Sequence, residues 1–300
     1  MNTRAQFSPV DVETAQTMSA PEAISYHYDN ETDFFALWLD PTLSYSCARW
    51  RDPQRPQEMA KDLAEAQRAK IAYHLDAVRL PPGGRLLDVG CGWGAALAAT
   101  VARDPGATAL GLTLSNDQHT HIKSSAVPGV DVMLRDIFAF EAEQPFQGAL
   151  SIGAFEHFAR PQMDRSEKLA IYATLFEKLA GMLEPEARFS LQTIVWDAVS
   201  FEEGKELLPQ TVFPQSDLPY IDEIVEASHG HFRLAYMEND PGEYVRTLSA
   251  WIKNLRAVRD TVNSRYGAEK YAFFEDYLRR SRLAFRQGYN SLARFVLVRR

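Results

Sequence analysis

Leu86–Gly94, with the sequence LLDVGCGWG, is the stretch of the chain that decides its fold. Its leucines and valine form an apolar run short enough for a buried parallel strand. Its three glycines permit positive φ angles and let a ligand lie against bare backbone. The residues that follow, AALAATVA, predict a helix. A strand, a glycine turn and a helix form the first unit of a doubly wound sheet, which binds its ligands at the carboxyl ends of the strands.

The glycine spacing by itself leaves the ligand open. It is compatible with a dinucleotide, with S-adenosylmethionine (SAM) and with a tight turn that binds nothing. The composition is more restrictive: the chain has 300 residues and a formal net charge of −8, and its sequence contains no dense run of Lys and Arg. Such a run is what a polyanion or an anionic membrane requires. We therefore expect neither nucleic-acid binding nor stable membrane association.

The sequence also lacks the marks of an exported protein. Its first residues carry charges but no apolar core of a signal peptide, and no apolar run approaches the length of about 18 residues that spans a membrane. Cys47 and Cys91 are too few for a disulfide framework and lack the spacing of a zinc site. These features predict a cytoplasmic protein.

The hydrophobic pattern predicts a mobile leader over residues 1–22 and a single domain over residues 23–300. Residues 23–80 are predicted to be helical, with a last helix over Glu58–Leu80 that stops at PPGG. Apolar runs then alternate with helical stretches such as Lys168–Leu183, as in a parallel sheet covered on both faces. The five strands predicted here are Arg85–Val89, Thr108–Leu112, Val130–Leu134, Ala149–Ile152 and Arg188–Ile194.

Two later runs, Phe232–Met237 and Arg294–Val298, predict the last strands, antiparallel and at the edge of the sheet. Between them, Pro241–Phe285 has apolar residues at helical spacing. Long connections of this kind form lids that select a small molecule. We therefore expect residues 197–285 to include cap helices over the cofactor end of the sheet.

Six blocks of sequence resemble, in order, those of one enzyme family. They are YHYDN (26–30), LWLDPTLSYSCARW (37–50), LLDVGCGWG (86–94), GLTLSNDQ (111–118), SIGAFEHF (151–158) and FRQGY (285–289). Together they resemble the cyclopropane fatty acid synthase and mycolic acid methyltransferase family, from about Ile24 to the carboxyl terminus. The resemblance implies a class I SAM-dependent methyltransferase, an α/β fold with a Rossmann-like, seven-stranded, mostly parallel sheet and a helical cap. It also implies methyl transfer to an alkene carbon.

The resemblance places cofactor residues by their position in these motifs. Tyr45 and Ser46 come near the carboxylate end of SAM, and Gly90 and Gly92 lie under its methionine and ribose, where the backbone can approach closely. Asp136 is placed to accept from the adenine amino group; the family commonly has Trp-Glu here, and a solvated loop aspartate is the alternative. The complete predicted set is Tyr45, Ser46, Gly90, Gly92, Thr113, Leu114, Gln118, Asp136, Ile137 and Ile152.

The implied chemistry requires more than the cofactor. An alkene that attacks the sulfonium methyl becomes a tertiary carbocation, which must be shielded from water, stabilised and deprotonated. Glu156 follows the fourth predicted strand and should face the substrate crevice; the alternative is a carboxylate that caps the next helix. Tyr244 occupies the cap-tyrosine position of the family. Candidates for aromatic faces, each more often a packing residue, are Tyr45, Trp93, Phe155 and Trp196.

One departure from the family concerns its bicarbonate site. Cyclopropane-forming relatives hold this anion with groups that correspond here to Cys47, Ile152, Glu156 and Tyr244, and with a histidine where this chain has Gln192. A neutral amide holds an anion less strongly than an imidazolium. We therefore expect bicarbonate to be weakened or absent, Glu156 to be the base, and the product to be a methylated alkene instead of a cyclopropane.

The expected acceptor is a small, soluble isoprenoid alkene, because Trp196 is placed to shorten an alkyl channel and the chain has no basic membrane surface. The GAFEH glutamate and the TIVW tryptophan resemble the geranyl diphosphate C6-methyltransferases of benzastatin-type pathways. Such a prenyl diphosphate needs positive charge, for which the candidates are Mg²⁺ with Arg49, Arg51 or Arg246.

Two alternatives and several open points remain. The acceptor can instead be an acyl chain on a phospholipid or an acyl carrier protein, which the retained Cys47 and Tyr244 favour. Outside enzymes, a SAM-binding regulator without turnover has the same cofactor motif. The sequence identifies no metal ligands and leaves open whether the chain forms a homo-oligomer.

Overall fold

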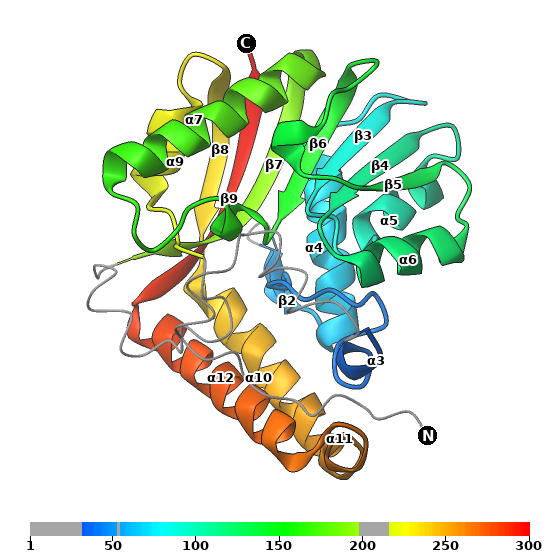
Figure 1. Ribbon diagram of the computed structural model, residues 1–300, viewed down its shortest axis with the longest axis vertical. Helices are drawn as coiled ribbons and strands as arrows, with labels where there is room; N and C mark the ends of the chain where they lie inside the picture. The colour runs from blue at the N-terminus through cyan, green and yellow to red at the C-terminus, as the bar shows by residue number, and fades with distance from the viewer. Residues whose placement is uncertain (1–31, 53–54, 198–215) are drawn as a thin grey trace.

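A seven-stranded sheet forms the centre of the computed structural model, which describes residues 32–52, 55–197 and 216–300 (Figure 1). The strand order is β5-β4-β3-β6-β7-β9-β8. The bounds are β3 (Arg85–Val89), β4 (Thr108–Thr113), β5 (Val130–Leu134), β6 (Phe146–Ile152), β7 (Leu183–Trp196), β8 (Phe232–Asn239) and β9 (Asn290–Arg299). The predicted leader and the YHYDN block lie outside the described residues.

The pairing of the strands confirms the predicted α/β class. Strands β3 to β7 run parallel to one another, whereas β9 pairs antiparallel with both β7 and β8. Only β8 is therefore an antiparallel edge strand, and the prediction that the last two strands both lie at the edge was wrong for β9. All residues of β9 except Arg299 are buried, which is typical of a strand covered on both faces.

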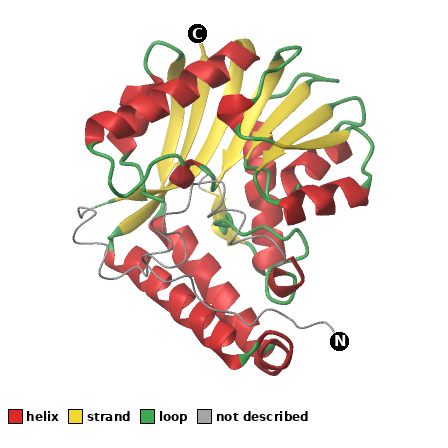
Figure 2. Cartoon of the chain, in the orientation of Figure 1, coloured by secondary structure: helices red, strands yellow, loops and turns green. Residues whose placement is uncertain are grey.

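Alternate residues of the strands face helices on opposite sides of the sheet (Figure 2). Leu86 packs in one apolar cluster with α4 (Leu63–Val78), α5 (Ala95–Arg103) and α6 (Asn116–Ser125). Leu87 packs in another with α7 (Arg165–Met182) and α9 (Ile221–Ser228). The short apolar runs of the sequence are thus buried from both faces, as a parallel sheet requires.

The region before β3 differs from the predicted helices over residues 23–80. It contains the short helix α3 (Thr32–Phe35), then β1 (Arg51–Asp52) and β2 (Arg55–Met59), which pair antiparallel, and then α4. The predicted helix over Glu58–Leu80 was wrong at its start, because Glu58 belongs to β2 and the Asp62 side chain caps α4 by accepting from the backbone N–H of Glu65.

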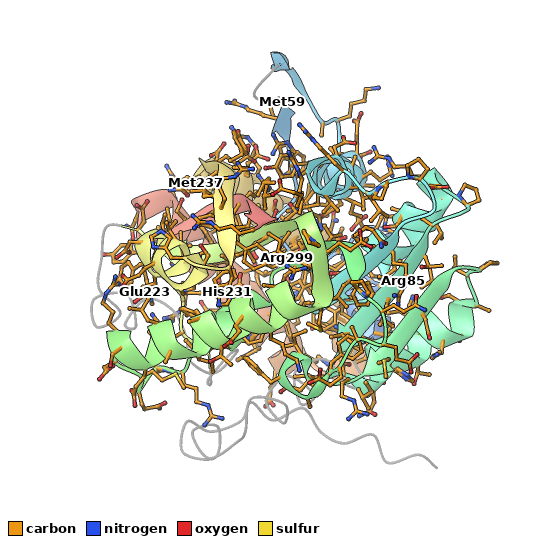
Figure 3. The ribbon with its side chains drawn as sticks, turned by 90° about the horizontal axis from the view of Figure 1, so that it is seen from above. Met59, Arg85, Glu223, His231, Met237 and Arg299 are labelled. Carbon is orange, nitrogen blue, oxygen red and sulfur yellow. The ribbon has the colours of Figure 1, made fainter. Side chains whose placement is uncertain are left out.

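The predicted cap consists of α10 (Pro241–Ala257), α11 (Arg259–Tyr266) and α12 (Ala268–Gln287). Its apolar side chains form one cluster with residues 34–39 and with Trp93 of the glycine turn. The cap therefore lies at the carboxyl end of β3. Arg85 and Arg299 mark the other end of the sheet, which faces the viewer in Figure 3. Among the described residues, no helix has both the length and the hydropathy that crossing a bilayer requires.

Candidate active site

A cavity of about 380 Å³ opens at the carboxyl ends of β3, β4 and β6. The loops that follow these strands form its walls, together with the segment Thr42–Ser46 and part of α4. The structure brings all ten residues that were predicted to bind the cofactor to this cavity: Tyr45, Ser46, Gly90, Gly92, Thr113, Leu114, Gln118, Asp136, Ile137 and Ile152.

The glycine turn shapes the floor of the cavity. Gly90 has a φ of +77°, and a Cβ there would lie 2.3 Å from the Cβ of Ala154, so no larger residue fits without displacing the loop after β6. Gly92 also has a positive φ, of +54°, but a Cβ there would meet nothing within 4 Å. Gly90 therefore allows two loops to meet, whereas Gly92 leaves open space beside bare backbone for a ligand.

Polar groups follow β4 and β5 at one end of the cavity. Ser115 caps α6 by accepting from the backbone N–H of Gln118. The Thr113 hydroxyl lies 2.7 Å from the side-chain oxygen of Gln118. Asp136 lines the cavity and accepts a 2.9 Å hydrogen bond from the backbone N–H of Phe138. One Asp136 oxygen is thus held by its own turn, and the place of this residue on the cavity wall is compatible with the predicted adenine contact.

Two buried ionisable groups of opposite type also line the cavity, and the sequence analysis did not identify either. The Lys70 ammonium donates to the Ser46 hydroxyl at 2.9 Å. Asp88 lines the cavity with an Oδ1 atom that has no hydrogen-bond partner among the described residues. Hydroxyls, an amide and two groups that can carry opposite charges line one cavity, which fits SAM with its ribose and zwitterionic amino acid.

Glu156 lies in the 3₁₀ turn Phe155–His157 that follows β6. Its neighbours Ala154 and His157 line the cavity, and its side chain is only 7% exposed. The Oε1 atom accepts a 2.7 Å hydrogen bond from the backbone N–H of Ile194, whereas Oε2 has no partner among the described residues. Burial raises the pKa of Glu156 to about 7, so the carboxyl can gain and lose a proton near neutral pH.

The cap places one tyrosine, Tyr277, within electrostatic range of Glu156, whereas the contacts shown for Tyr244 are with other aromatic rings of the cap. Tyr277 of α12 is hydrogen-bonded to Tyr45 and Ser281; burial raises its pKa to about 12, and the charge of Glu156 acts in the same direction. Tyr244 of α10 stacks on Phe285, with 4.4 Å between ring centroids. Sequence reasoning missed Tyr277 because its place beside Tyr45 depends on how the cap folds back.

Gln192 is held at both ends of its side chain. Its carbonyl oxygen accepts from Nε of Arg294 at 2.7 Å, and its amide group donates to the backbone oxygen of Cys47 at 3.1 Å. Arg294 is itself 2% exposed and also pairs with Glu238 at 2.9 Å. Burial raises the pKa of the Cys47 thiol to about 12, so this sulfur stays protonated at neutral pH.

Of the other predicted aromatic residues, Trp93 lines the cavity, whereas Phe155 and Trp196 lie outside its walls. Phe155 packs in the core on Tyr172, with 4.6 Å between ring centroids. Trp196 donates from its indole N–H to Asp217 at 2.9 Å. These contacts give both rings a packing or anchoring role, and they supply no support for a place beside the acceptor.

The three arginines predicted to hold a diphosphate do not converge on the cavity. Arg49 binds Glu238 and lies over the ring of Tyr73, Arg51 is exposed on β1, and Arg246 lies 3.7 Å from Glu243. Among the described residues, no three His, Cys, Asp or Glu side chains are grouped as metal ligands.

Comparisons with known proteins agree with this geometry. Residues 15–295 match the model of a family described as mycolic acid cyclopropane synthetase. Cyclopropane mycolic acid synthase 2 of Mycobacterium bovis is 33% identical over 297 residues, which cover 93% of this chain and 94% of that protein. The solved structure of a cyclopropane synthase from Mycobacterium tuberculosis matches with a TM-score of 0.80 and 29% identity, over 94% of this chain and 99% of the other.

A geranyl diphosphate C-methyltransferase from Streptomyces coelicolor is also similar in structure. It matches with a TM-score of 0.66 over 95% of this chain and 99% of its own, but it is only 14% identical. Identity this low shows a shared fold and gives no information about the acceptor.

Proposed function

The chain belongs to the mycolic acid cyclopropane synthetase family, and we propose that this SAM-dependent methyltransferase transfers the methyl group to an alkene carbon of an acyl chain. The relatives that share about a third of its sequence are named for mycolic acid, which supports an acyl acceptor over the prenyl diphosphate expected from the sequence. The protein partners of Arg49 and Arg246 point in the same direction, because arginines already paired with carboxylates are less available to a diphosphate.

The observation that carries the proposal is the buried Glu156 carboxyl beside the cofactor cavity. One of its oxygens is fixed by the backbone N–H of Ile194, and the other is free of protein partners among the described residues. A carboxylate that is positioned by one oxygen can accept a proton with the other. Its pKa, raised by burial to about 7, suits a general base at neutral pH.

SAM supplies an electrophilic methyl group when it is bound. The alkene π electrons form the new carbon–carbon bond while the electrons of the broken sulfur–methyl bond stay on sulfur, so positive charge passes to the neighbouring carbon of the acceptor. Glu156 takes a proton from the methylated acceptor, whose remaining electron pair forms a double bond or closes a ring. The apolar cap and the buried carboxylate keep water from the cation and compensate its charge.

The contacts of Gln192 support the methylated alkene as the product. The Gln192 oxygen accepts from Arg294 and one of its two amide N–H groups donates to the backbone oxygen of Cys47, so at most one neutral N–H group is left for an anion. Without a bound bicarbonate, proton removal falls to Glu156.

Incubation with SAM and three candidate acceptors tests the proposal: an unsaturated acyl phospholipid, an unsaturated acyl carrier protein, and geranyl diphosphate with Mg²⁺. We expect a mass gain of one CH₂ on an acyl chain, retained olefinic proton signals, and loss of turnover in Glu156→Gln with intact binding of S-adenosylhomocysteine (SAH). A mass gain only on geranyl diphosphate would show that the acceptor is a prenyl diphosphate. A cyclopropane product would contradict the role given to Gln192. SAH binding without any product would indicate a regulator.

A further inference from the structure

Helix α4 carries a stripe of buried polar side chains on the face toward the cavity. Gln67, Lys70 and His74 are spaced by three and four residues, so they share one helix face, and none is more than 2% exposed. Buried polar groups at these positions are costly unless each has a partner. Their partners lie on two segments, the Ser44–Ser46 loop and β7.

Two residues of the stripe fasten the Ser44–Ser46 loop to α4. The Gln67 amide donates to the backbone oxygens of Ser44 at 3.2 Å and Ser46 at 2.9 Å. One turn further along the helix, the Lys70 ammonium donates to the Ser46 hydroxyl at 2.9 Å. The Gln67 amide therefore fixes the backbone of Ser46, and the Lys70 ammonium fixes its side chain.

The direction of the hydrogen bond between Lys70 and Ser46 determines whether the Ser46 hydroxyl can donate to a ligand. An ammonium group only donates hydrogen bonds, so the Ser46 oxygen is the acceptor, and its own proton is free to point elsewhere. Lys70 and Ser46 both line the cavity, as does Asp88, whose pKa is raised by burial to about 7. A hydroxyl proton backed by a positive charge is an arrangement that binds a carboxylate.

We propose that Lys70 is a positioning residue for the carboxylate end of SAM, acting through the Ser46 hydroxyl. The inference rests on the proposed seat of SAM at Ser46 and is independent of the acceptor. Lys70 orients the hydroxyl toward the ligand and supplies the positive charge that a carboxylate needs when it leaves water. The competing explanation is that Lys70 only compensates the negative charge of the buried carboxyl groups Asp40 and Asp88 and keeps the cavity folded.

Two ligands that differ in the amino acid end separate these explanations. SAH carries the carboxylate, and 5′-methylthioadenosine has the same adenosine and a thioether but no amino acid. In calorimetry, Lys70→Met should weaken the affinity for SAH by about 10- to 100-fold, which is the range of one charge-assisted hydrogen bond. The affinity for methylthioadenosine should change by less than about twofold. Lys70→Arg should recover part of the SAH affinity. Lys61→Met, at an exposed lysine just before α4, is the matched control and should bind both ligands normally.

A double variant tests whether the effect passes through Ser46. If Lys70 acts by orienting the hydroxyl, Ser46→Ala should weaken SAH strongly in the natural chain but by less than about twofold in Lys70→Met. Additive losses would overturn the route through Ser46. Equal losses of SAH and methylthioadenosine in Lys70→Met would show that Lys70 is only structural. Failure of the unmodified protein to bind SAH would instead overturn the proposed seat of SAM itself.

Discussion

Replacement of Glu156 by Gln should abolish turnover and stabilise the fold. In the folded chain, burial raises the pKa of this carboxyl from 4.5 to about 7. As the pH rises above 4.5, the unfolded chain loses this proton before the folded chain does, so the carboxyl makes the fold progressively less stable until the pH passes 7. At 1.36 kcal/mol per pKa unit, the difference amounts to about 3 kcal/mol. A neutral Gln keeps the contact with the Ile194 N–H and does not ionise.

Urea unfolding of both proteins at pH 4 and at pH 8.5 measures this effect. Relative to the natural chain, the free energy of unfolding of Glu156→Gln should be about 3 kcal/mol higher at pH 8.5 than at pH 4, so the variant gains relative stability as the pH rises. The control is Glu177→Gln, an exposed position on α7, where we expect little change. A difference that stays constant with pH would refute the raised pKa and remove the main support for Glu156 as a base that titrates near neutrality.

Three further predictions concern the same site. The value of kcat/KM should rise about tenfold per pH unit below pH 7 and level off above it, because Glu156 must be ionised to accept a proton; a profile that falls over this range would oppose the assignment. Gly90→Ala should lower the free energy of unfolding by about 1–3 kcal/mol and weaken SAH, because its Cβ meets that of Ala154; unchanged unfolding and SAH titrations would disprove the close approach. Gln192→Leu should cost about 2–3 kcal/mol of stability, since Arg294 Nε loses its acceptor, while SAH affinity in calorimetry stays within about twofold.

The sheet could be predicted because its strands are buried from both sides. Five apolar runs gave strands at nearly their observed positions, and the glycine turn fixed where the ligand cavity opens. The errors lie where tertiary pairing decides the structure. Glu58 continues a helical pattern in the sequence but belongs to β2, which pairs with β1. Strand β9 is the last in the chain, which suggests a place at the edge of the sheet, but it lies between β7 and β8. Local periodicity carries no information about either pairing.

The site was predictable only where one short motif supplies the residue. Eight of the ten predicted cofactor residues lie at the carboxyl ends of β3 to β6 or just after them, where the fold brings the strand ends together, whereas Tyr45 and Ser46 come from the segment before β1. Lys70 was missed for a different reason: on α4 it resembles a solvent-exposed lysine between apolar residues. Gln67 and His74 at helical spacing from it were the available signal, because three polar residues on one face of a buried helix require polar partners.

The neutral side chain of Gln192 on β7 is hydrogen-bonded to the charged side chain of Arg294 on β9. Arg294 is buried on β9 with its Nε atom 2.7 Å from the Gln192 oxygen, and Glu238 pairs with the same guanidinium. If a histidine stood at position 192, its protonation would place a second positive charge beside the Arg294 guanidinium. Repulsion between the two charges would lower the pKa of the histidine and keep its ring neutral. His74 illustrates the effect, because burial first and Arg294 second hold the pKa of that histidine well below its ordinary value. Restoring an imidazolium, and with it an anion site, therefore requires a change at Arg294 as well as at Gln192.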